Sequence, residues 1–415
     1  MQVVYPRCCG LDVHKQLIVA CLLVRGERGG LHKEVRTFGT TTDEILRLGD
    51  RLHAAGCTAV ARESSGVYWQ PVCNLLEETF TLLVVNAQQI KAVPGRKTDV
   101  RDAEWIAELL QHGLLRPSFI PDRPQRELRE LTRYRTTLVR ERAAEVNRIQ
   151  QVLEGANITL AGVASDILGV SGRAMLRALI DGETDPAALA ELAKGKLRSK
   201  RELLEQALQG RVRPHHRFLL AEQLRHIEAL DAAIERVSAE IAERVRPVEE
   251  VIERLLTIPG MGRRTAEVLV AEIGPDVSRF PSAGQLASWA GLCPGQQQSA
   301  GKRTGGSGRR GSPWLRAALT EAAWGAARTK GTSLAAQYRR LVARRGAQRA
   351  IVATGHSILV SLYHMLRAGR SYADLGGDYF DQRERQAVQR RLVRRLERLG
   401  LTVTVEPRAP AAAGP

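Results

Sequence analysis

The sequence predicts an α/β domain followed by a longer and mostly helical region. Up to about residue 120, short apolar runs alternate with amphipathic segments, which is the pattern of a sheet covered by helices. Farther along, apolar residues recur every seven positions within charged sequence, as they do in long paired helices. The chain has 415 residues, 44% of them hydrophobic. It can therefore build two or three cores, because one domain usually holds roughly 100 to 200 residues.

Five short apolar runs are expected to form strands. They are Cys8 to Asp12, Leu17 to Val24, Glu34 to Gly39, Thr58 to Glu63 and Thr81 to Asn86. Amphipathic spacing predicts helices over Thr42 to Ala55, Tyr68 to Glu78 and Asp102 to His112. Three strands in succession, followed by strands that are separated by helices, indicate a mixed sheet that begins with a meander.

Two long helices are predicted to follow the sheet. Apolar residues spaced along charged sequence from Pro124 to about Glu154 indicate one amphipathic helix. A seven-residue repeat predicts the second helix and gives it a coiled-coil seam. The repeat consists of Leu220, Ile227, Ile234, Ile241 and Val248. The pair could space two domains or serve as a dimerisation arm, and a basic patch, Lys194 to Arg201, lies between its two helices in the sequence.

These patterns divide the chain into four parts. Residues 1–121 are expected to form the α/β domain, residues 122–251 a helical linker region, and residues 252–370 a second compact domain that is mostly helical. Residues 371–415 form a basic tail that carries five arginines on one expected helix and ends in Ala, Pro and Gly. We expect roughly the last ten residues of this tail to be disordered.

The charge balance favours a polyanionic partner. Lysine and arginine number 62 against 45 aspartates and glutamates, which gives a net charge of +17. Nucleic acid is the first expectation, and an anionic membrane surface is the competitor. No segment has the roughly 20 uncharged apolar residues of a membrane span, and Met1 to Arg7 lacks the apolar core of a signal peptide. We therefore expect a cytoplasmic protein whose six cysteines, with no C-x-x-C pair among them, are reduced packing residues.

Four carboxylates are candidates for a metal site. Asp12 ends the first predicted strand and Glu63 ends the fourth, so both could lie at one edge of the sheet. Asp99 and Asp102 are three residues apart, which places them on one face at the start of a helix. Such a cluster repels itself unless divalent cations neutralise it, and hard oxygen ligands select Mg²⁺ or Mn²⁺. Each residue alone has a simpler explanation, as a helix cap, a first-turn charge or an ion-pair partner.

The order of these carboxylates resembles the ribonuclease-H-like fold of the RuvC resolvase type. The surrounding motifs are similar to those of the DEDD transposases of bacterial insertion sequences, in the insertion-sequence-110 family. They are G-L-D-V-H-K, E-S-S-G-V-Y-W, V-V-N-A-Q-Q-I-K and G-R-K-T-D-V-R-D-A-E-W. The resemblance implies that the metal-ligand quartet of the family falls on Asp12, Glu63, Asp99 and Asp102.

A second set of candidates lies in the C-terminal half. The segment Leu256 to Gly262 looks like half of a helix-hairpin-helix, whose P-G-x-G turn offers backbone N–H groups to a phosphate. A plain glycine-containing helix turn is the alternative. From Lys302 to Arg349 the sequence is strongly basic with a single acid, Glu321, which favours contacts with backbone phosphates over a solvated face. The candidate nucleic-acid-binding residues are Lys97, Gly260, Gly262, Arg263, Arg264, Lys302, Arg303, Arg309, Arg310 and Arg316.

Ser299 stands among small residues in the motif Q-S-A-G-K, close to Lys302 and Arg303. A lone serine hydroxyl is a weak nucleophile until it is activated, so this position alone does not predict catalysis. The surrounding sequence, from A-S-W-A-G-L-C-P-G through S-P-W-L-R-A-A-L, resembles the second conserved domain of the same family. The resemblance implies that Ser299 attacks the scissile phosphate, forms a covalent protein–DNA intermediate and frees a 3′-hydroxyl. Ser307 and Ser312 share the loop and are the fallback assignments.

The resemblance spans roughly Cys8 to Gly369 and implies a transposase or site-specific DNA recombinase of a bacterial insertion sequence. It also implies a structured guide RNA that pairs with donor and target DNA, and a homo-oligomer, a dimer or a tetramer, with shared active sites. Such a protein would be associated with the nucleoid when it is bound to DNA. Two alternatives stay open: a RuvC-type metal-dependent hydrolase of branched DNA that uses water as its nucleophile, and a non-catalytic nucleic-acid-binding scaffold.

Overall fold

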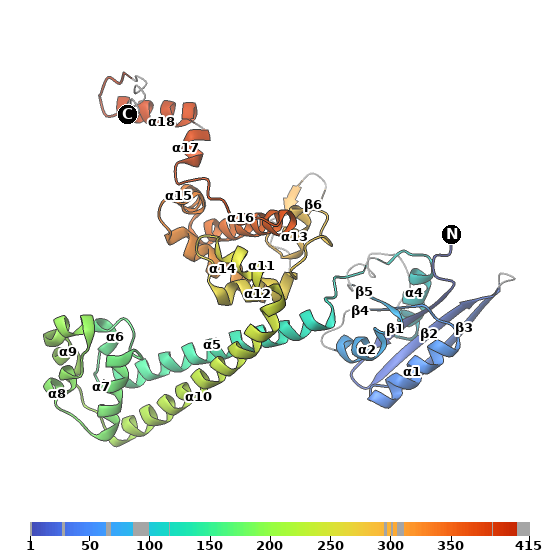
Figure 1. Cartoon of the computed structure of the whole chain (residues 1–415), viewed down its shortest axis with the longest axis horizontal. Coiled ribbons are helices and arrows are strands. Elements are labelled where there is room, and N and C mark those ends of the chain that lie inside the picture. The colour runs from blue at the N-terminus through green and yellow to red at the C-terminus, as the bar shows by residue number, and fades with distance from the viewer. Residues whose placement is uncertain are drawn as a thin grey trace. The chain divides into compact units, whose positions relative to one another are not determined.

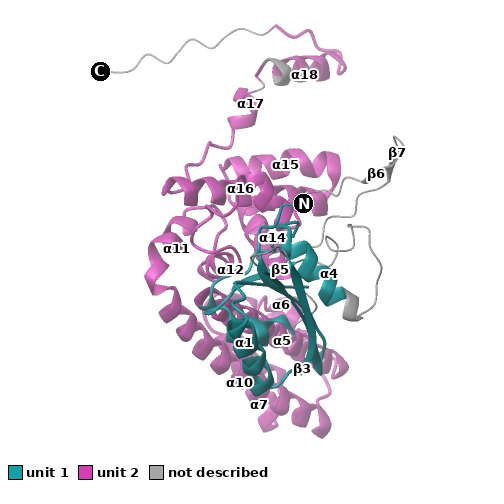
Figure 2. Ribbon diagram, turned by 90° about the vertical axis from the view of Figure 1, so that its right-hand side faces the viewer, with its two compact units in different colours: residues 1–123 teal, residues 124–415 magenta. Residues whose placement is uncertain are grey.

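The structure is a computed structural model. It describes residues 2–26, 30–63, 68–85, 99–115, 117–293, 297–299, 302–304, 311–383 and 385–404. The chain forms two compact units, Met1–Arg123 and Pro124–Pro415, which Figure 2 colours teal and magenta. Each unit has its own buried apolar core. The finer four-part division of the sequence stays a prediction.

The first unit is built on a five-stranded mixed sheet with the strand order β3-β2-β1-β4-β5. The strands are β1 (Arg7–Val13), β2 (Leu17–Arg25), β3 (Leu31–Gly39), β4 (Ala59–Glu63) and β5 (Thr81–Val85). The first three form an antiparallel meander, whereas β4 pairs in parallel with both β1 and β5. The mixed sheet with an initial meander is therefore confirmed, and β3 begins at Leu31 rather than at the predicted Glu34.

Helices cover both faces of this sheet (Figure 1). They are α1 (Thr42–Ala54) and α2 (Trp69–Leu76) on one face and α4 (Asp99–Gln111) on the other. Successive strand residues point to opposite faces, so Cys8 belongs to the core under α4 and Cys9 to the core under α1 and α2. Helix α4 includes both predicted aspartates, because it extends back to Asp99 rather than beginning at Asp102.

Two long helices form an antiparallel pair in the second unit, as Figure 1 shows. They are α5 (Arg123–Gly155) and α10 (Pro214–Val245). Their direction follows from the cross-pair contacts, because Arg142 contacts Asp231 while Glu145, farther along α5, contacts His226, earlier on α10. The predicted seam is buried at Leu220, Ile227, Ile234 and Ile241.

The last member of the predicted seven-residue repeat, Val248, is not part of the long helix. Val248 lies beyond α10, in the short 3₁₀ turn η2 (Arg246–Val248). Pro247 has no backbone N–H and clashes with the preceding turn, so the α-helix ends at Val245.

Short helices close one end of the long pair. They are α6 (Leu160–Val163), α7 (Val170–Asp181), α8 (Pro186–Glu191), η1 (Gly195–Lys200) and α9 (Arg201–Leu208). Their apolar side chains share one core with Ile149 of α5 and Ile227 of α10. The predicted basic patch at Lys194 to Arg201 lies in η1 and at the start of α9, and most of its residues are exposed.

Where the structure describes it, the rest of the second unit consists of helices, their connections and a small hairpin. Its helices are α11 (Glu249–Leu256), α12 (Arg263–Ile273), α13 (Ala283–Trp289), α14 (Pro313–Arg328), α15 (Ser333–Arg345), α16 (Ala347–Ala368), α17 (Tyr379–Arg383) and α18 (Arg385–Glu397). Helix α16 packs against α13, α14 and α15. Strands β6 (Gln297–Ser299) and β7 (Lys302–Thr304) form the antiparallel hairpin. Residues 405–415, for which we expected disorder, lie outside the described residues.

Most of the cysteines are buried packing residues, as predicted. Five of the six are buried, and Cys293 is partly exposed. Burial raises the pKa of the Cys8 and Cys21 thiols to about 12 and that of Cys57 to about 11, so these thiols stay protonated at neutral pH. Within the described part of the chain, no helix is both long enough and apolar enough to cross a membrane.

Candidate metal centre and serine loop

Asp12 and Glu63 lie at the same end of two neighbouring parallel strands. The register of β1 and β4 pairs Leu11 with Arg62, so Asp12 and Glu63 occupy the next matched positions along the two strands. Matched residues of paired strands point to the same face of a sheet. Asp12 has the parity of Cys8, and Glu63 has the parity of Ala61, and both of these residues lie in the core under α4. The two carboxylates therefore belong to the face that α4 covers.

Helix α4 approaches β1 closely at Gly10. A Cβ atom at Gly10 would lie 2.3 Å from the carbonyl oxygen of Ala103 and 2.4 Å from the nitrogen of Ala107, so only glycine fits. One step back along the strand, the Cys8 thiol lies 3.6 Å from the Ala107 carbonyl oxygen. Two residues of a strand span about 6.6 Å, and four residues of a helix span about 6 Å. Moving along β1 from Gly10 to Asp12 therefore matches moving along α4 from Ala103 back to its first turn. Asp12 thus lies beside the first turn of α4.

The first turn of α4 carries Asp99 and Asp102. The backbone thus brings all four predicted ligand positions to one end of the sheet, on one face. Carboxylate oxygens are hard ligands, and a set of four fits Mg²⁺ or Mn²⁺ chemically. The side chains described here do not complete that site, however. Among them, no three His, Cys, Asp or Glu groups lie close enough together to hold a metal ion, and the side chain of Asp99 falls outside the description.

His14 contacts the first of these carboxylates. Its Nε2 lies 3.0 Å from Oδ2 of Asp12, and its side chain is far more exposed than that of Asp12. A ring nitrogen at this distance can orient the carboxylate by a hydrogen bond. His14 lies two residues after Asp12 in the motif G-L-D-V-H-K, and the structure shows that the two side chains are in contact.

Arg62 is a functional candidate that the sequence analysis did not identify. It is 2% exposed, and its Nε and Nη2 donate to the backbone carbonyl oxygen of Glu63 at 2.9 and 2.5 Å. Burial is the main cause that lowers the pKa of its guanidinium to about 10. Among described residues its Nη1 has no hydrogen-bond partner. The side chain therefore holds the last peptide of β4, the strand end that carries Glu63.

The turn of the predicted helix-hairpin-helix joins α11 to α12. Gly260 has a φ of +79°, and a Cβ atom there would lie 2.1 Å from the nitrogen of Ala326 in α14. Both facts require glycine, and the second shows that this part of the turn packs against α14. Gly262 is the N-cap residue of α12, and a Cβ atom added there would meet no atom within 4 Å. Of the two glycines, Gly262 is therefore the one that leaves open space in front of the helix N-terminus.

Arg263 and Arg264 differ sharply in their surroundings. The Arg263 guanidinium donates to both carboxylate oxygens of Glu249, at 2.6 and 2.8 Å, and to Glu267 at 3.1 Å. The hydrogen bonds from Arg263 lower the pKa of Glu249. Arg264 is exposed and lines a cavity of about 290 Å³ together with Arg140 and Trp314. Both arginines are exposed, but the guanidinium of Arg263 is engaged by two carboxylates, so Arg264 is the better candidate for a phosphate contact.

A larger cavity, of about 800 Å³, lies beside the same helix N-terminus. Its lining includes Gly260, Gly262, Trp324 and Arg328. The lining also includes Glu321. The Trp324 ring and the Arg328 guanidinium could contact a base and a phosphate, whereas the Glu321 carboxylate would repel a phosphate.

Ser299 is the last residue of β6, and its backbone pairs with that of Lys302 in β7. The side chains of Ser299, Lys302 and Arg303 lie outside the description. Four further candidates also fall outside the described residues: Lys97, Ser307, Arg309 and Arg310. Arg316 is described and is exposed on α14.

Ser312, a fallback nucleophile in the sequence analysis, is the N-cap of α14. Its Oγ accepts a hydrogen bond from the nitrogen of Leu315 at 3.3 Å and donates to Oε2 of Glu272 at 3.0 Å. The hydroxyl is therefore engaged both as an acceptor and as a donor. The dipeptide Ser-Pro at the start of a helix is a sequence signal for this capping role.

Comparison with known proteins decides the family. Residues 9–158, which contain all four carboxylates, match the DEDD transposase domain. Residues 252–339, which contain Ser299, match a model described as the transposase IS116/IS110/IS902 family. A probable family 20 transposase of Pseudomonas aeruginosa is 30% identical over 270 residues, which cover 64% of this chain and 70% of that protein. The chain belongs to the IS110/IS116/IS902 family of transposases.

Other relatives of this transposase agree. A 44.8 kDa protein of insertion element IS116 from Streptomyces clavuligerus is 30% identical over 303 residues, 64% of this chain and 73% of that protein. The transposase of insertion sequence element IS1111A from Coxiella burnetii is 27% identical over 296 residues, 70% of this chain and 72% of that protein. The transposase is thus a DNA phosphoryl-transfer enzyme, and its DEDD domain implies the use of a divalent metal.

Proposed function

We propose that this transposase cleaves and rejoins DNA strands through a covalent serine intermediate. In this proposal Ser299 is the nucleophile, and Asp12, Glu63, Asp99 and Asp102 hold Mg²⁺ or Mn²⁺ in a ribonuclease-H-like domain of the RuvC type. The main support is the placement of Asp12 and Glu63 at matched ends of parallel strands, on the face where the first turn of α4 carries the other two carboxylates.

The chain's own residues would prepare the metal site. The close contact at Gly10 sets the distance between α4 and β1, and Arg62 holds the backbone of β4 at Glu63. His14 fixes Asp12 by contact with one of its oxygens. When bound, the metal would stabilise the charge on the attacking and leaving oxygens of the phosphodiester.

The serine step conserves the phosphodiester bond. Ser299 Oγ forms a bond to phosphorus, the bond from phosphorus to the 3′ oxygen breaks, and the proton lost by the serine is balanced by the proton that the 3′-hydroxyl gains. In the reverse step a 3′-hydroxyl of another strand attacks the seryl phosphate, restores the serine and joins the two strands. No water is consumed. Lys302 stands opposite Ser299 in the hairpin and supplies positive charge to this segment.

We further propose a structured guide RNA and a homo-oligomer. The net charge of +17 and the exposed basic patch at Lys194 to Arg201 support a second nucleic-acid partner. The mechanism requires Ser299 and the carboxylates to act on the same phosphate, within one chain or between subunits. An antiparallel helix pair such as α5 and α10 is suited to a dimerisation arm, which supports the second arrangement.

Substitution of the nucleophile and of one metal ligand tests the proposal. The full-length protein would be expressed with the non-coding sequence that flanks its element and then incubated with DNA that carries the element's end. Ser299→Ala and Asp12→Ala should each abolish strand cleavage, and mass spectrometry should find a DNA adduct on Ser299 in the unchanged protein. Chelation of divalent cations should also stop cleavage, and added Mg²⁺ should restore it.

Two controls make the result interpretable. Asp50→Ala removes an exposed carboxylate of α1 and should leave cleavage intact. Ser307→Ala removes another serine of the loop that carries Ser299 and should also leave cleavage intact. If cleavage survives Ser299→Ala but not Asp12→Ala, water is the nucleophile and the hydrolase alternative is correct. If all activity survives Asp12→Ala, the proposed metal site is wrong.

A further inference from the structure

The loop that carries Ser299 is closed at its base by a backbone contact. It leaves helix α13 at Ala290 and Gly291 and returns at Gly311, immediately before Ser312. A Cβ atom at Gly311 would lie 2.3 Å from the carbonyl oxygen of Ala290 and 2.7 Å from the nitrogen of Gly291. The two ends of the loop therefore touch through their main chains. We call Ala290, Gly291, Gly311 and Ser312 the neck of the serine loop.

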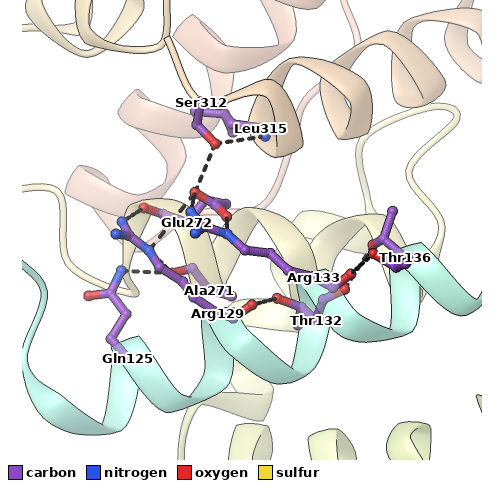
Figure 3. Close-up of polar contacts among 10 residues, drawn as sticks. Gln125, Arg129, Thr132, Arg133, Thr136, Ala271, Glu272, Ser312 and Leu315 are labelled. Carbon is purple, nitrogen blue, oxygen red and sulfur yellow. Dashed lines mark hydrogen bonds and ion pairs between the residues drawn. The ribbon is translucent and has the colours of Figure 1, made fainter. Parts of the chain in front are cut away.

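A buried carboxylate holds the neck from one side. Glu272, in the last turn of α12, is 1% exposed, and its Oε2 accepts a hydrogen bond from Ser312 Oγ at 3.0 Å. Figure 3 shows the Ser312 hydroxyl directed toward this carboxylate, with the Leu315 nitrogen on its other side. Because the hydroxyl donates to one group and accepts from the other, its orientation is fixed. We call the contact between Ser312 and Glu272 the latch.

Helix α5 holds the same carboxylate from the opposite side. Arg133 donates to both oxygens of Glu272, through Nε at 2.7 Å and Nη2 at 3.0 Å (Figure 3). Arg129 donates to the carbonyl oxygen of Ala271 at 2.9 Å, and Gln125 donates to the same oxygen at 3.0 Å. A guanidinium that donates two hydrogen bonds to one carboxylate fixes both the position and the plane of that carboxylate. The latch is therefore held in a fixed position relative to α5.

The latch differs from an ordinary helix cap in its donor bond. Thr332 caps α15 with the same acceptor bond, from the nitrogen of Ala335 at 3.2 Å. Its hydroxyl, however, donates to Thr329, within its own turn. Ser312 instead donates to a side chain of a helix 40 residues away in the sequence. The donor bond of Ser312 therefore joins two elements, which a cap alone does not require.

We infer that Glu272 and Ser312 are positioning residues for the serine loop. They hold the neck against α5, so that the segment with Ser299 is presented to DNA from a fixed base. The inference rests on the proposed role of Ser299 as the nucleophile. Neither Glu272 nor Ser312 touches the scissile phosphate in this role, and their effect is on the geometry of attack.

The test compares two helix caps of equal chemistry. Ser312→Ala removes a cap and the latch, whereas Thr332→Ala removes a cap alone. Both should lower the melting temperature, Ser312→Ala by more because it also removes a hydrogen bond to the buried Glu272 carboxylate, and both should leave DNA binding unchanged in fluorescence anisotropy. Only Ser312→Ala should slow formation of the serine–DNA adduct, by about tenfold or more, because misplacement of reacting groups by about 1 Å can cost a factor of about 100. Ser312→Thr keeps the hydroxyl and should restore the rate.

A double substitution tests whether the two residues act as one unit. If the latch is real, Ser312→Ala combined with Glu272→Met should slow adduct formation no more than Glu272→Met does alone, because methionine has no oxygen to accept the Ser312 hydrogen bond and both changes therefore break the same contact. Additive losses would overturn the inference. So would equal adduct rates for Ser312→Ala and Thr332→Ala.

Failure of the proposed function gives a different result. If Ser299→Ala still forms an adduct or cleaves DNA, Ser299 is not the nucleophile, whatever Ser312→Ala does. If the adduct maps to Ser312, or vanishes in Ser312→Ala while it persists in Ser299→Ala, then Ser312 is itself the nucleophile and the positioning role is wrong. Loss of the adduct in Ser299→Ala, with unchanged rates in Ser312→Ala, refutes the latch alone.

Discussion

Arg135 and Glu267 form an ion pair that is almost completely enclosed, with side chains 3% and 4% exposed and a distance of 2.6 Å between Nη1 and Oε2. Removal of one partner from such a pair leaves a buried charge without its counterion. Arg246 and Glu243 form a pair of the same type with side chains 73% and 62% exposed, where water can replace the lost partner. The two pairs therefore differ in burial while their chemistry is the same.

Arg135→Ala should lower the free energy of unfolding by about 3 to 5 kcal/mol, because it leaves Glu267 buried without its main partner. Arg263 also contacts Glu267, at 3.1 Å, which favours the lower end of that range. Arg246→Ala should cost less than about 1 kcal/mol, as surface pairs do. Urea unfolding measures both, and equal losses would mean that burial adds nothing to this pair.

For single residues, the sequence indicated which ones are candidates better than it indicated which residues they contact. The four carboxylates were named as candidates from their motifs and Ser299 from the family resemblance, and the roles of all five stay predictions. The partner of Arg263 could not be named in this way, since Glu249 lies on the other helix of the hairpin, and only the fold of the turn brings the two together. Arg62 was missed because nothing in its local sequence indicates that its guanidinium bonds the carbonyl oxygen of Glu63.

At the scale of elements, the position of α4 depends on one glycine. Any side chain at Gly10 would overlap the backbone of Ala103 and Ala107, so the helix would have to move away from β1. That movement would carry the first turn of α4, with two of the four carboxylates, away from Asp12. The packing of one helix and the geometry of the candidate metal centre are therefore linked.

Gly10→Ala should destabilise the protein by about 1 to 3 kcal/mol, because the core has no room for a methyl group there. It should also weaken metal-dependent DNA cleavage more than it weakens DNA binding. Gly26→Ala is the matched control, since its new Cβ atom would meet nothing closer than 3.7 Å. Thermal unfolding and a Mg²⁺ titration of cleavage measure the two effects, and an unchanged Mg²⁺ requirement in Gly10→Ala would contradict the link.

Elements were predicted well where periodicity is undisturbed. All five strands of the first unit and both long helices follow from the spacing of apolar residues. The errors lie at the ends of elements, where a single residue decides where a helix or strand stops. The repeat continued through Val248 in the sequence, but Pro247 ends the helix before it. The meeting of the two loop ends at Gly311 could not be predicted, because a glycine that permits a close approach looks like any other glycine in a flexible-looking loop.

For the whole molecule, the net charge of +17 predicts strong dependence of DNA binding on salt. If the transposase neutralises about 6 to 10 phosphates, raising the salt concentration from about 50 to 200 mM should lower its affinity by a factor of roughly 10³ to 10⁵. Arg264→Ala should reduce the slope of log affinity against log salt by about one, because it removes one phosphate contact. Arg47→Ala, in which the lost guanidinium already contacts Glu44, is the control. Fluorescence anisotropy measures the slopes, and equal slopes in both variants would exclude Arg264 from the interface.

The contacts of α5 also set an order of assembly during synthesis. Gln125, Arg133 and Arg135 bond to residues that follow them by 146, 139 and 132 positions. At roughly 5 to 20 residues per second, the ribosome needs on the order of ten seconds to supply those partners. The ribosome has synthesised the whole first unit before that interval begins, and the arginines of α5 have no carboxylate partners until it ends. The nascent chain therefore finishes its carboxylate-bearing unit first, and the base of the serine loop cannot close until α12 and α14 have left the ribosome.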